Sequence, residues 1–498
     1  MTPGCTTSRT ALPTLLAVLA AGLCASGGAL AQAPARRAPA SQPPARIEPP
    51  PSMVGTGRSR TLAEALAITY ATNPALQAAR AQLRGVDENV PGALAGWRPQ
   101  VTFSSTIGYI EGTSLIHNQG VTREANALRG INSETLSVTQ PLYRGGQTRA
   151  GTNRAENQVF AQRAALIASE QTAFTNAVNA YVGVIQSSQV LGLNINNEQV
   201  LSRQLQATRD RFRVGEITRT DVAQAEAALA GAAATRQTAE GNLATARATY
   251  AQVVGETPER LIEPQPLRLP AKTLDDARSL ATTNNPNVVA ALFNDSAAKD
   301  NFDLQYARLM PTVTLQGQLS RNEDVVQKDA TTKIGQIIAS ITVPIYQGGA
   351  EYAAIRQARQ QQQQTRKQVD DQRRTAEQQV TSAWQTNSSV RATIESTRQQ
   401  IRSNEIALEG VQREAIVGSR TTLDVLNAEQ LLLVTRVTLV QNLASLVNAS
   451  YSVASAAGRL TARDLSLNVP LYDETAYYKA VRDRWIGTGD YATEQPGR

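Results

Sequence analysis

The sequence predicts an α+β protein of two similar halves, in which each half joins a β-hairpin to very long helices. The first observation is an internal duplication, because matching segments occur in the same order in both halves. The second is a composition of 41% apolar but only 4% aromatic residues, which is typical of long packed helices rather than of several globular cores. The matching segments are Thr61–Ala79 with Thr273–Ala291, Thr139–Gly146 with Thr342–Gly349, and Arg213–Glu226 with Ile416–Glu429.

The scarcity of reactive side chains excludes most catalytic sites. The 498 residues include 1 His and 2 Cys, so a metal site or a Cys/His or Ser/His/Asp arrangement has almost no residues to draw on. We therefore expect no enzyme activity, no cofactor and no metal. The formal net charge is +7, and the basic residues are interspersed with acidic ones. This pattern does not predict nucleic-acid binding. A mean hydropathy of -0.29, with no long apolar run after the N-terminus, excludes a bundle of transmembrane helices.

The N-terminus fits a secretory signal peptide that covers residues 1–31. Arg9 supplies the positive charge, Leu12–Leu23 is apolar, and Ala29-Leu30-Ala31 matches the small-residue cleavage site. An uncleaved anchor, or a lipid attached to Cys24, fits these residues less well. Both cysteines precede the expected cut, so the exported chain would contain no thiol and no disulfide.

Composition and turn signals divide the rest of the chain into four parts. In each of two repeats a short helix ends at an Asn-Pro pair, because proline restricts the residue before it, and a second helix, a hairpin and long helices follow. The four parts are a Pro/Ala-rich disordered segment at 32–59, a first repeat at 60–270, a second repeat at 271–460 and a C-terminal tail at 461–498. The hairpins are expected at about 99–142 and 311–345, and the long helices at about 146–254 and 350–458.

The long helices carry apolar residues at every seventh position, which indicates a coiled-coil seam. The clearest series is Phe160, Ile167, Phe174 and Tyr181. Gly215 and Gly418 interrupt the two helical regions, since glycine commonly ends a helix. Each long helix runs away from its strands, so we expect the two turns to lie together, far from the hairpins.

The predicted strands alternate apolar with small polar residues. The first carries Val101, Phe103, Ile107 and Tyr109 on one face. This alternation over about 10 residues is typical of transmembrane β-strands, although a single hairpin of this kind would also fit a half-buried sheet. The first half is longer than the second between its strands, and we expect the extra residues, which include His117, to form a loop.

Four strands of this kind cannot close on themselves in a membrane. Open edges leave backbone groups unpaired in hydrocarbon, and closed barrels start at about eight strands. The hairpins therefore predict an oligomer, and two, three or four copies would each close a barrel. The same copies would bring their long helices together into a coiled-coil tube.

Residues 60–460 resemble the outer-membrane efflux protein family, the TolC-like channel-tunnels. The resemblance rests on the duplicated segment with its Asn-Pro pair, on the strand-to-helix junctions QPLYRGG and VPIYQGG, and on the two glycine-containing helix turns. It implies a homotrimeric channel-tunnel. Four strands from each protomer would form a twelve-stranded transmembrane β-barrel, continued by a long periplasmic α-helical coiled-coil barrel.

The resemblance also implies a function in the cell outer membrane, with a large periplasmic part. The chain would be the exit duct of a tripartite efflux pump, of a type I secretion system, or of both. Its partners would be a periplasmic adaptor protein, an inner-membrane transporter of the RND, MFS or ABC type, and outer-membrane lipid. The alternative is a structural or adhesive trimeric coiled-coil surface protein without a pore. It would explain the seven-residue repeats but not the duplication or the hairpins in both halves.

The resemblance places the functional residues in the two helix turns. In the second turn, Asp424 corresponds to the family's gate aspartate, and Asn427 stands at a position that is often acidic. Three copies of Asp424 would form an acidic ring that narrows the pore and selects cations. Arg420 matches a latch arginine, and Thr220 and Asp221 of the first turn match its partner positions.

The remaining positions of the turns concern the latch and the adaptor. Ala415 stands where the family has a tyrosine, so part of the latch is missing. A structural alternative applies to Thr220, Asp221, Thr422 and Asp424, because Thr and Asp near a helix start cap free N–H groups. The positions at which an adaptor would dock are Gly215, Thr218, Gly418 and Leu423.

Two glycine pairs mark the passage from strand to helix. Gly145-Gly146 and Gly348-Gly349 follow Tyr143 and Tyr346. We expect the glycines to be structural bends and the tyrosines to lie near the membrane interface.

Overall fold

The first half begins with two short helices that meet at Asn73. The computed structural model describes residues 59–118, 120–325 and 328–489, so the predicted signal peptide and residues 32–58 lie outside the described part. Strand β1 (Ser59–Arg60) pairs in parallel with β4 (Arg260–Leu261). Ser59, the last residue of the expected disordered segment, belongs to a strand.

The same order of elements occurs in both halves. The long helices begin and end within two residues of the predicted limits. The first half contains α1 (Leu62–Thr72), α2 (Pro74–Asp87), α3 (Asn89–Leu94), the 3-10 turn η1 (Ala95–Trp97), β2 (Gln100–Asn118), β3 (Val121–Arg144), α4 (Gln147–Arg213) and α5 (Arg219–Val254). The second contains α6 (Leu274–Asn284), α7 (Pro286–Tyr306), η2 (Ala307–Leu309), β5 (Thr312–Glu323), β6 (Thr331–Thr342), α8 (Ala350–Ile416) and α9 (Thr422–Ala456), and α10 (Ala476–Val481) follows in the tail.

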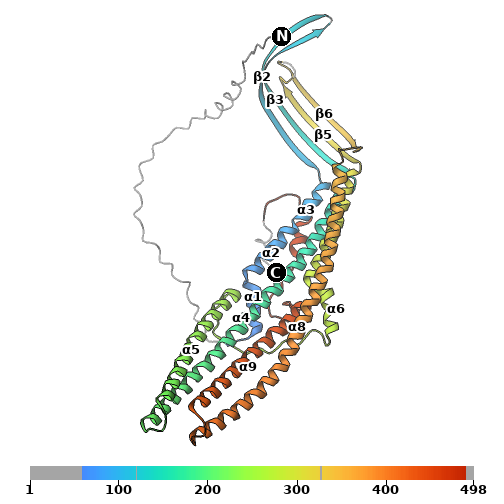
Figure 1. Cartoon of the computed structure of the whole chain (residues 1–498). Coiled ribbons are helices and arrows are strands. Elements are labelled where there is room, and N and C mark those ends of the chain that lie inside the picture. The colour runs from blue at the N-terminus through green and yellow to red at the C-terminus, as the bar shows by residue number, and fades with distance from the viewer. Residues whose placement is uncertain (1–58, 119, 326–327, 490–498) are drawn as a thin grey trace, which may run out of the picture. The chain divides into compact units, whose positions relative to one another are not determined.

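Within Gly57–Arg498, the long helices form two hairpins that pack against each other. α4 packs against α5, α8 packs against α9, and α4 also packs along α9. Figure 1 shows α5, α4, α9 and α8 side by side, with the strands at the opposite end of the helices from the two turns. This arrangement is the one expected from helices that run away from their strands.

Two of the four predicted heptad residues of α4, Phe174 and Tyr181, lie at the centre of the main core, whereas Phe160 is 40% exposed. Phe174 and Tyr181 are fully buried, and they pack in one cluster with Leu66 of α1, Leu76 of α2 and Tyr250 of α5. Burying each side chain of this size contributes about 1.5–3 kcal/mol. The core therefore ties α4 to the short helices and to the second member of its own hairpin.

The hydroxyl of Tyr181 secures both ends of the first half to α4. Its oxygen lies 2.8 Å from the carbonyl oxygen of Arg60 and 2.6 Å from that of Ile262, and it accepts a hydrogen bond from the Ile262 N–H at 3.1 Å. Burial raises the pKa of Tyr181 to about 12. The phenol therefore remains protonated, and a donor, throughout the physiological range.

Each Asn-Pro pair joins two helices end to end. Asn73 caps α2 by accepting hydrogen bonds from the N–H groups of Ala75 and Leu76, and its Nδ2 donates to the carbonyl of Val253 at 3.1 Å, next to the end of α5. Asn285 likewise caps α7, and its Nδ2 donates to the carbonyl of Ala456 at 3.1 Å, at the end of α9. Thus α5 abuts α2, and α9 abuts α7, without a continuous backbone.

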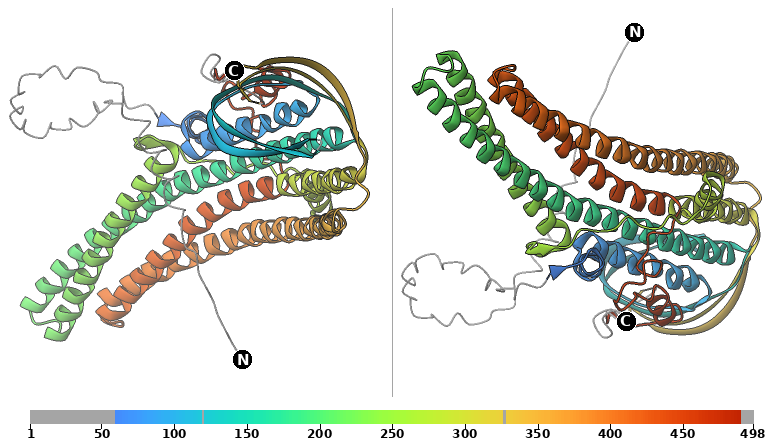
Figure 2. Two further views of the ribbon diagram at one scale, coloured as in Figure 1. Left: turned by 90° about the horizontal axis from the view of Figure 1, so that it is seen from above. Right: turned by 90° about the horizontal axis from the view of Figure 1, so that it is seen from below.

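The strands of both halves join in one four-stranded antiparallel sheet of order β2-β3-β5-β6. The two hairpins meet where β3 pairs with β5, with Leu136 opposite Leu319. A bulge between Pro141 and Tyr143 shifts the register near the base of the sheet. Figure 2 shows that the strands curve around one side of the helix ends.

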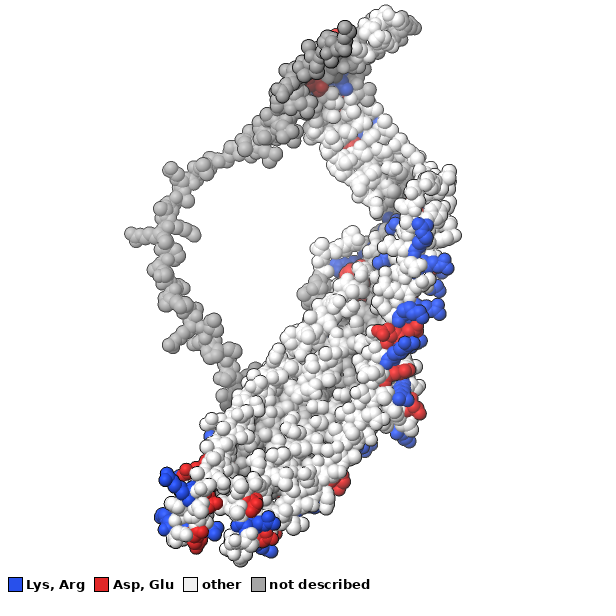
Figure 3. Space-filling view, in the orientation of Figure 1, with Lys and Arg blue, Asp and Glu red and all other residues white. Residues whose placement is uncertain are grey.

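The register brings the apolar residues of all four strands to one face. Phe103 lies opposite Leu136, and Leu136 opposite Leu319; Val101 lies opposite Val138. Ile107 is 81% exposed and Ile337 of β6 is 80% exposed, so this face has no cover within the described chain. Figure 3 shows few charged side chains on the side of the sheet that faces the viewer. A contiguous exposed apolar face of this kind marks a membrane or protein contact.

The opposite face is less uniformly polar than predicted. Thr102 and Ser137 share a hydrogen bond there, and Gln336 donates to Gln318. However, Ile334 and Ile338 of β6 lie on the same face as Gln336 and are partly exposed. β6 also ends at Thr342, three residues earlier than expected.

The predicted loop in the first half is wrong. β2 continues to Asn118 and β3 begins at Val121, so His117 lies in a strand, directly opposite Thr122. The Thr122 hydroxyl and the His117 Nε2 lie 2.9 Å apart. Since β5 pairs with β3 only from Asn132 onward, the extra residues lengthen the first hairpin into a two-stranded ribbon beyond β5 and β6.

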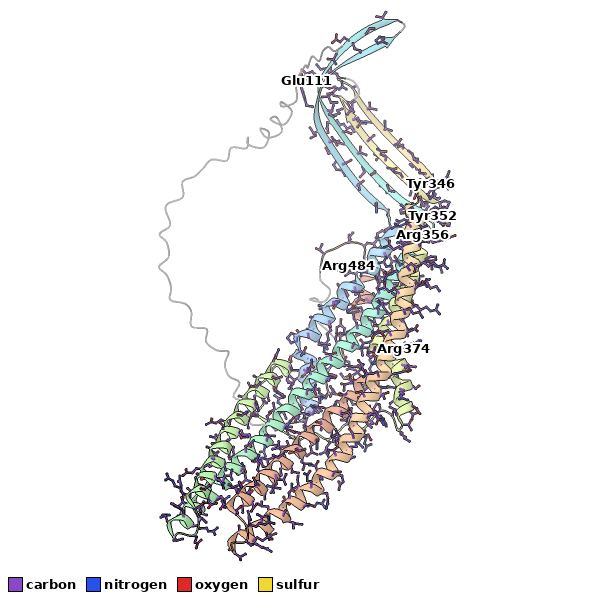
Figure 4. All side chains as sticks on the ribbon, viewed as in Figure 1. Glu111, Tyr346, Tyr352, Arg356, Arg374 and Arg484 are labelled. Carbon is purple, nitrogen blue, oxygen red and sulfur yellow. The ribbon has the colours of Figure 1, made fainter. Side chains whose placement is uncertain are left out.

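The base of the sheet carries exposed aromatic side chains where the strands give way to helices. Tyr346 and Tyr352 flank the start of α8 and are both exposed (Figure 4). Gly145 and Gly146 have φ values of +60° and +90°, and Gly348 and Gly349 have +67° and +84°. These left-handed conformations favour glycine, in agreement with the structural role expected for the bends.

Candidate functional site at the helix turns

The two helix turns lie at the same end of the helices, opposite the sheet (Figure 1). They hold every residue that the sequence predicts to be functional. Close to the turns, Leu201 of α4, Ala232 of α5 and Leu426 of α9 are buried in one cluster. The turns are therefore carried by helix hairpins that contact each other.

In the first turn, a glycine ends α4 and a capping box starts α5. Gly215 has φ +82°, and the N–H of Glu216 donates to the carbonyl of Arg211 at 3.0 Å, as in a Schellman motif. Thr218 accepts a hydrogen bond from the N–H of Asp221 at 3.3 Å. The Asp221 carboxylate in return accepts from the N–H of Thr218 at 3.0 Å and from its hydroxyl at 2.7 Å.

The second turn has the same construction. Gly418 has φ +80°, and the N–H of Ser419 donates to the carbonyl of Glu414 at 3.0 Å. Thr421 accepts from the N–H of Asp424 at 3.3 Å, and the Asp424 carboxylate accepts from the N–H of Thr421 at 3.0 Å and from its hydroxyl at 2.9 Å. Asp221 and Asp424 are thus structural twins, each at the third position of its helix.

The capping residues are not all those expected. Thr218 and Thr421 are the N-caps, whereas Thr220 and Thr422 lie inside the first turns of α5 and α9. Thr218, predicted as an adaptor position, therefore has a structural role of its own. The spacing Thr-x-x-Asp was visible in both turns and is the signal of a capping box.

The capping bonds hold both carboxylates in the ionised form. Hydrogen bonds from Thr218, first from its side chain and then from its backbone, lower the pKa of Asp221. The backbone and then the side chain of Thr421 lower the pKa of Asp424, with a smaller effect from the Arg420 charge. Both groups therefore carry a negative charge at neutral pH.

Arg420 is bonded within its own helix hairpin. Its Nε donates to Glu414 at 2.9 Å, and both side chains are about half exposed. The hydrogen bonds of Asp221 go to Thr218, so the structure of one chain does not bring the predicted latch residues together. Asn427 and Leu423 are exposed on the first turns of α9 and are available to other molecules.

The turns also concentrate charge. Charged side chains gather at the turns in Figure 3. Near the turns, Arg209 of α4 bonds to Glu226 of α5 at 2.7 Å, and Gln412 of α8 bonds to Glu429 of α9 at 3.1 Å. Exposed ion pairs contribute only about 0–1 kcal/mol each. These charged residues therefore contribute little to stability, and their main effect is on the charge of the surface that a partner would contact.

Two further features of the described part of the chain concern metal sites and membrane-spanning helices. No group of three or more His, Cys, Asp or Glu side chains suited to a metal occurs among residues 59–489 outside the gaps at 119 and 326–327. In the same part of the chain, α9 alone is long and apolar enough to cross a membrane. One such helix is weak evidence of a span, and α9 packs along α8 and α4.

Comparison with known proteins agrees with this architecture. The sequence profile described as outer membrane efflux protein matches residues 66–256 and 277–459. The chain is 37% identical over 433 residues to the outer membrane efflux protein BepC of Brucella suis biovar 1, covering 86% of this chain and 92% of BepC. It is 26% identical over 432 residues to the outer membrane protein TolC of Escherichia coli K12, covering 79% of this chain and 81% of TolC.

A solved structure supports the same fold. The outer membrane protein VceC of Vibrio cholerae superposes with a TM-score of 0.69 at 20% identity, over 80% of this chain and 96% of VceC. The fold and the two matched repeats define an outer-membrane channel protein. The chain belongs to the outer membrane efflux protein family, whose members are channels for efflux and secretion and not enzymes. It is an outer-membrane protein with a periplasmic helical part.

Proposed function

We propose that three copies of the chain form an outer-membrane exit duct, with a closed twelve-stranded barrel continued by a helical tube. The observation that carries this proposal is the sheet, which has an apolar face across four strands and two edges, β2 and β6, that pair on one side only. In hydrocarbon those edges need partners. Because adjacent strands alternate in direction, β6 of one copy and β2 of the next would pair antiparallel, as strands do within the sheet.

The helix turns are the proposed docking site for a periplasmic adaptor, which would connect the duct to an inner-membrane transporter of the RND, MFS or ABC type. A Cβ atom added at Gly215 or Gly418 would meet nothing within 4 Å, so a partner can approach the backbone closely at both glycines. Leu423, 45% exposed, adds an apolar contact beside Gly418. Arg420, Thr220 and Asp221 would then act as a latch between copies rather than within one chain.

The alternative, an adhesive coiled-coil surface protein without a pore, does not explain the exposed apolar face of the sheet. The two functions differ in one measurement. The purified assembly should conduct ions in a planar bilayer if it is a duct, and should leave the bilayer non-conducting if it is a surface fibre.

Closure of the barrel can be tested by cross-linking its edges. We expect Thr106→Cys on β2, combined with Gln336→Cys or Ser340→Cys on β6, to give disulfide-linked dimers and trimers on denaturing gels. All three side chains belong to the same face of the sheet, and the sequence contains no cysteine after Cys24. Disulfides require Cα atoms about 4.4–6.8 Å apart, so only adjacent strands will react.

The matched control is Thr106→Cys with Gln318→Cys. Gln318 lies on β5, which β3 separates from β2. This pair should remain monomeric on the same gels. Absence of cross-links with both β6 positions, or equal cross-linking of the control, would show that the edges do not meet in this way.

We further propose that Asp424 lines the narrowest part of the duct, and its twin Asp221 provides the control. Asp424→Asn should reduce cation selectivity, because three carboxylates in a confined ring attract cations. Asp221→Asn should leave selectivity unchanged. Each substitution alters a capping box of the same construction, so both should change thermal stability by a similar amount.

Reversal potentials measured across a salt gradient would separate the two roles. We expect the reversal potential to shift toward zero in Asp424→Asn but not in Asp221→Asn. If both variants lose stability equally and neither changes the reversal potential, Asp424 is a helix cap and the gate assignment is wrong.

A further inference from the structure

A carboxyl group occupies the apolar stripe of α2. The residues of α2 that face the core are Leu76, Ala79, Leu83 and Asp87, at the three- and four-residue spacing of one helix face. Asp87 is fully buried, and neither of its carboxyl oxygens has a hydrogen-bond partner. Such a group is costly to bury in its charged form, because nothing replaces the water that it loses.

The charged groups around Asp87 do not compensate for this loss. Arg163 of α4 attracts the carboxylate, but no ion pair joins them among the described residues, and its buried Nε also has no hydrogen-bond partner. The Arg163 guanidinium instead lies 5.5 Å from the ring centre of Phe160 and 5.3 Å from that of Tyr478. Glu88, which follows α2, and Glu474 in the tail both oppose the negative charge of Asp87.

The C-terminal segment, defined here as residues 471–486, covers this end of α2. Its helix α10 packs against α2, and Val481 is fully buried. Tyr478 joins the apolar cluster formed by Val86, Val90 and Val159 beside Asp87. The segment thus removes water from the neighbourhood of the carboxyl group.

Polar bonds hold the segment along its length. The N–H of Tyr472 donates to the hydroxyl of Tyr70 at 3.0 Å, and the hydroxyl of Tyr477 donates to Glu88 at 2.8 Å. Tyr478 and Arg482 both lie 3.3 Å from a carboxylate oxygen of Glu156 on α4.

The segment also reaches the base of the sheet. Arg98, which precedes β2, donates to the carbonyl of Arg484 at 2.7 Å and stacks 5.0 Å from the ring centre of Trp485. Figure 4 shows Arg484 in a loop beside the helices that lead to β2.

We propose that Asp87 makes the docking of the C-terminal segment onto α2 and α4 dependent on pH, with the protonated carboxyl favouring the docked form and the ionised carboxyl loosening it. The proposal does not depend on what the duct transports. It concerns an equilibrium within one chain that any preparation of the intact protein can report.

The sign of the effect follows from the surroundings of the carboxyl. Burial is the largest influence, and it raises the pKa of Asp87 to about 7. When the segment leaves, water returns and the pKa falls toward the ordinary value of 3.8. The docked form therefore binds more protons than the open form, so docking is strongest in acid and weakens as the pH rises through about 7.

Hydrogen–deuterium exchange of the intact, detergent-purified protein would test this proposal. After correction for intrinsic exchange rates, peptides from 471–486 should open at least about tenfold more at about pH 8.5 than at about pH 5.5, because the linked proton is lost over that range. In Asp87→Asn, which keeps the shape but cannot ionise, opening should be the same at both pH values.

Asp473→Asn is the matched control within the segment itself. Hydrogen bonds from Thr475 lower the pKa of the exposed Asp473, so this group is ionised at both pH values. The control should therefore keep the pH dependence of the unmodified protein.

Two results would overturn the proposal. One is equal opening of the unmodified segment across the pH range, which is informative even if Asp87→Asn does not fold. The other is an Asp87→Asn protein that retains the full pH dependence, which would assign the effect to Glu156, Glu474 or another charged group.

Discussion

Leu319→Arg should abolish assembly, whereas Gln316→Arg should leave it intact. Leu319 is 62% exposed on the apolar face of β5, between Leu136 of β3 and Gly335 of β6. A charged side chain on the lipid face costs up to about 2–4 kcal/mol, a value that applies at the midplane of the bilayer and falls toward its interfaces. The cost would be incurred in every copy of an oligomer, so we expect trimers to disappear from size-exclusion profiles of the extracted outer membrane.

Gln316 is a stringent control, because it is an exposed residue of the same strand. It belongs to the opposite face, which would line the water-filled interior, where an arginine remains hydrated. Equal loss of trimer in both variants would mean that the apolar face does not meet lipid.

Gly145→Ala should destabilise the protein far more than Gly348→Ala, although the two glycines are equivalent in the repeat. Both have left-handed backbone, with φ of +60° and +67°, and alanine in that conformation costs about 1–2 kcal/mol. At Gly145 a Cβ atom would also lie 2.5 Å from the Cβ of Met310 and 2.7 Å from the carbonyl oxygen of Ala307. Such overpacking adds about 1–3 kcal/mol.

The added Cβ at Gly348 meets nothing within 4 Å, so the second substitution reports the backbone cost alone. Denaturant unfolding of the two variants should therefore differ by about 1–3 kcal/mol in the free energy of unfolding. Equal values would show that η2 moves away freely and that the close contact at Gly145 is not needed for the bend.

The helices were predictable because residues close together in the sequence determine where each helix begins and ends. Proline is absent from the long helical stretches, Gly215 and Gly418 end them, and the Asn-Pro pairs set the joints of the short helices. The seven-residue series likewise identified Phe174 and Tyr181, which are fully buried, although its first member, Phe160, is exposed. Each of these features depends on residues close together in the sequence, where propensity and periodicity act directly.

The pairing of strands was only partly predictable. Alternation identified the apolar face, but the contact of β3 with β5 joins residues far apart in the sequence and leaves no local signal. The residues around His117 were predicted to form a loop because the first half is longer there than the second. They form a ribbon because β2 and β3 pair with each other there, which requires hydrogen bonds but no buried side.

The helix turns show the same limit at the level of the site. The sequence located Asp221 and Asp424 at the starts of their helices, but it placed the caps at Thr220 and Thr422 instead of Thr218 and Thr421. Any function that needs several copies, such as a ring of Asp424, lies beyond the contacts of one chain. Asp87 was missed because neither its spacing nor its neighbours reveal that the distant C-terminal segment covers it.

The end-to-end helix joints have a mechanical consequence. Where α5 abuts α2 and α9 abuts α7, the amide groups of Asn73 and Asn285 bridge the breaks. The helical backbone is interrupted at such a joint, and each hydrogen bond that bridges it, including that from Thr72 to the carbonyl of Val254, contributes only about 0.5–1.5 kcal/mol. α4 and α8, by contrast, continue without a break past these joints. Each hairpin thus pairs one stiff rod with one jointed rod, and the jointed member is the one that can pivot while the sheet stays still.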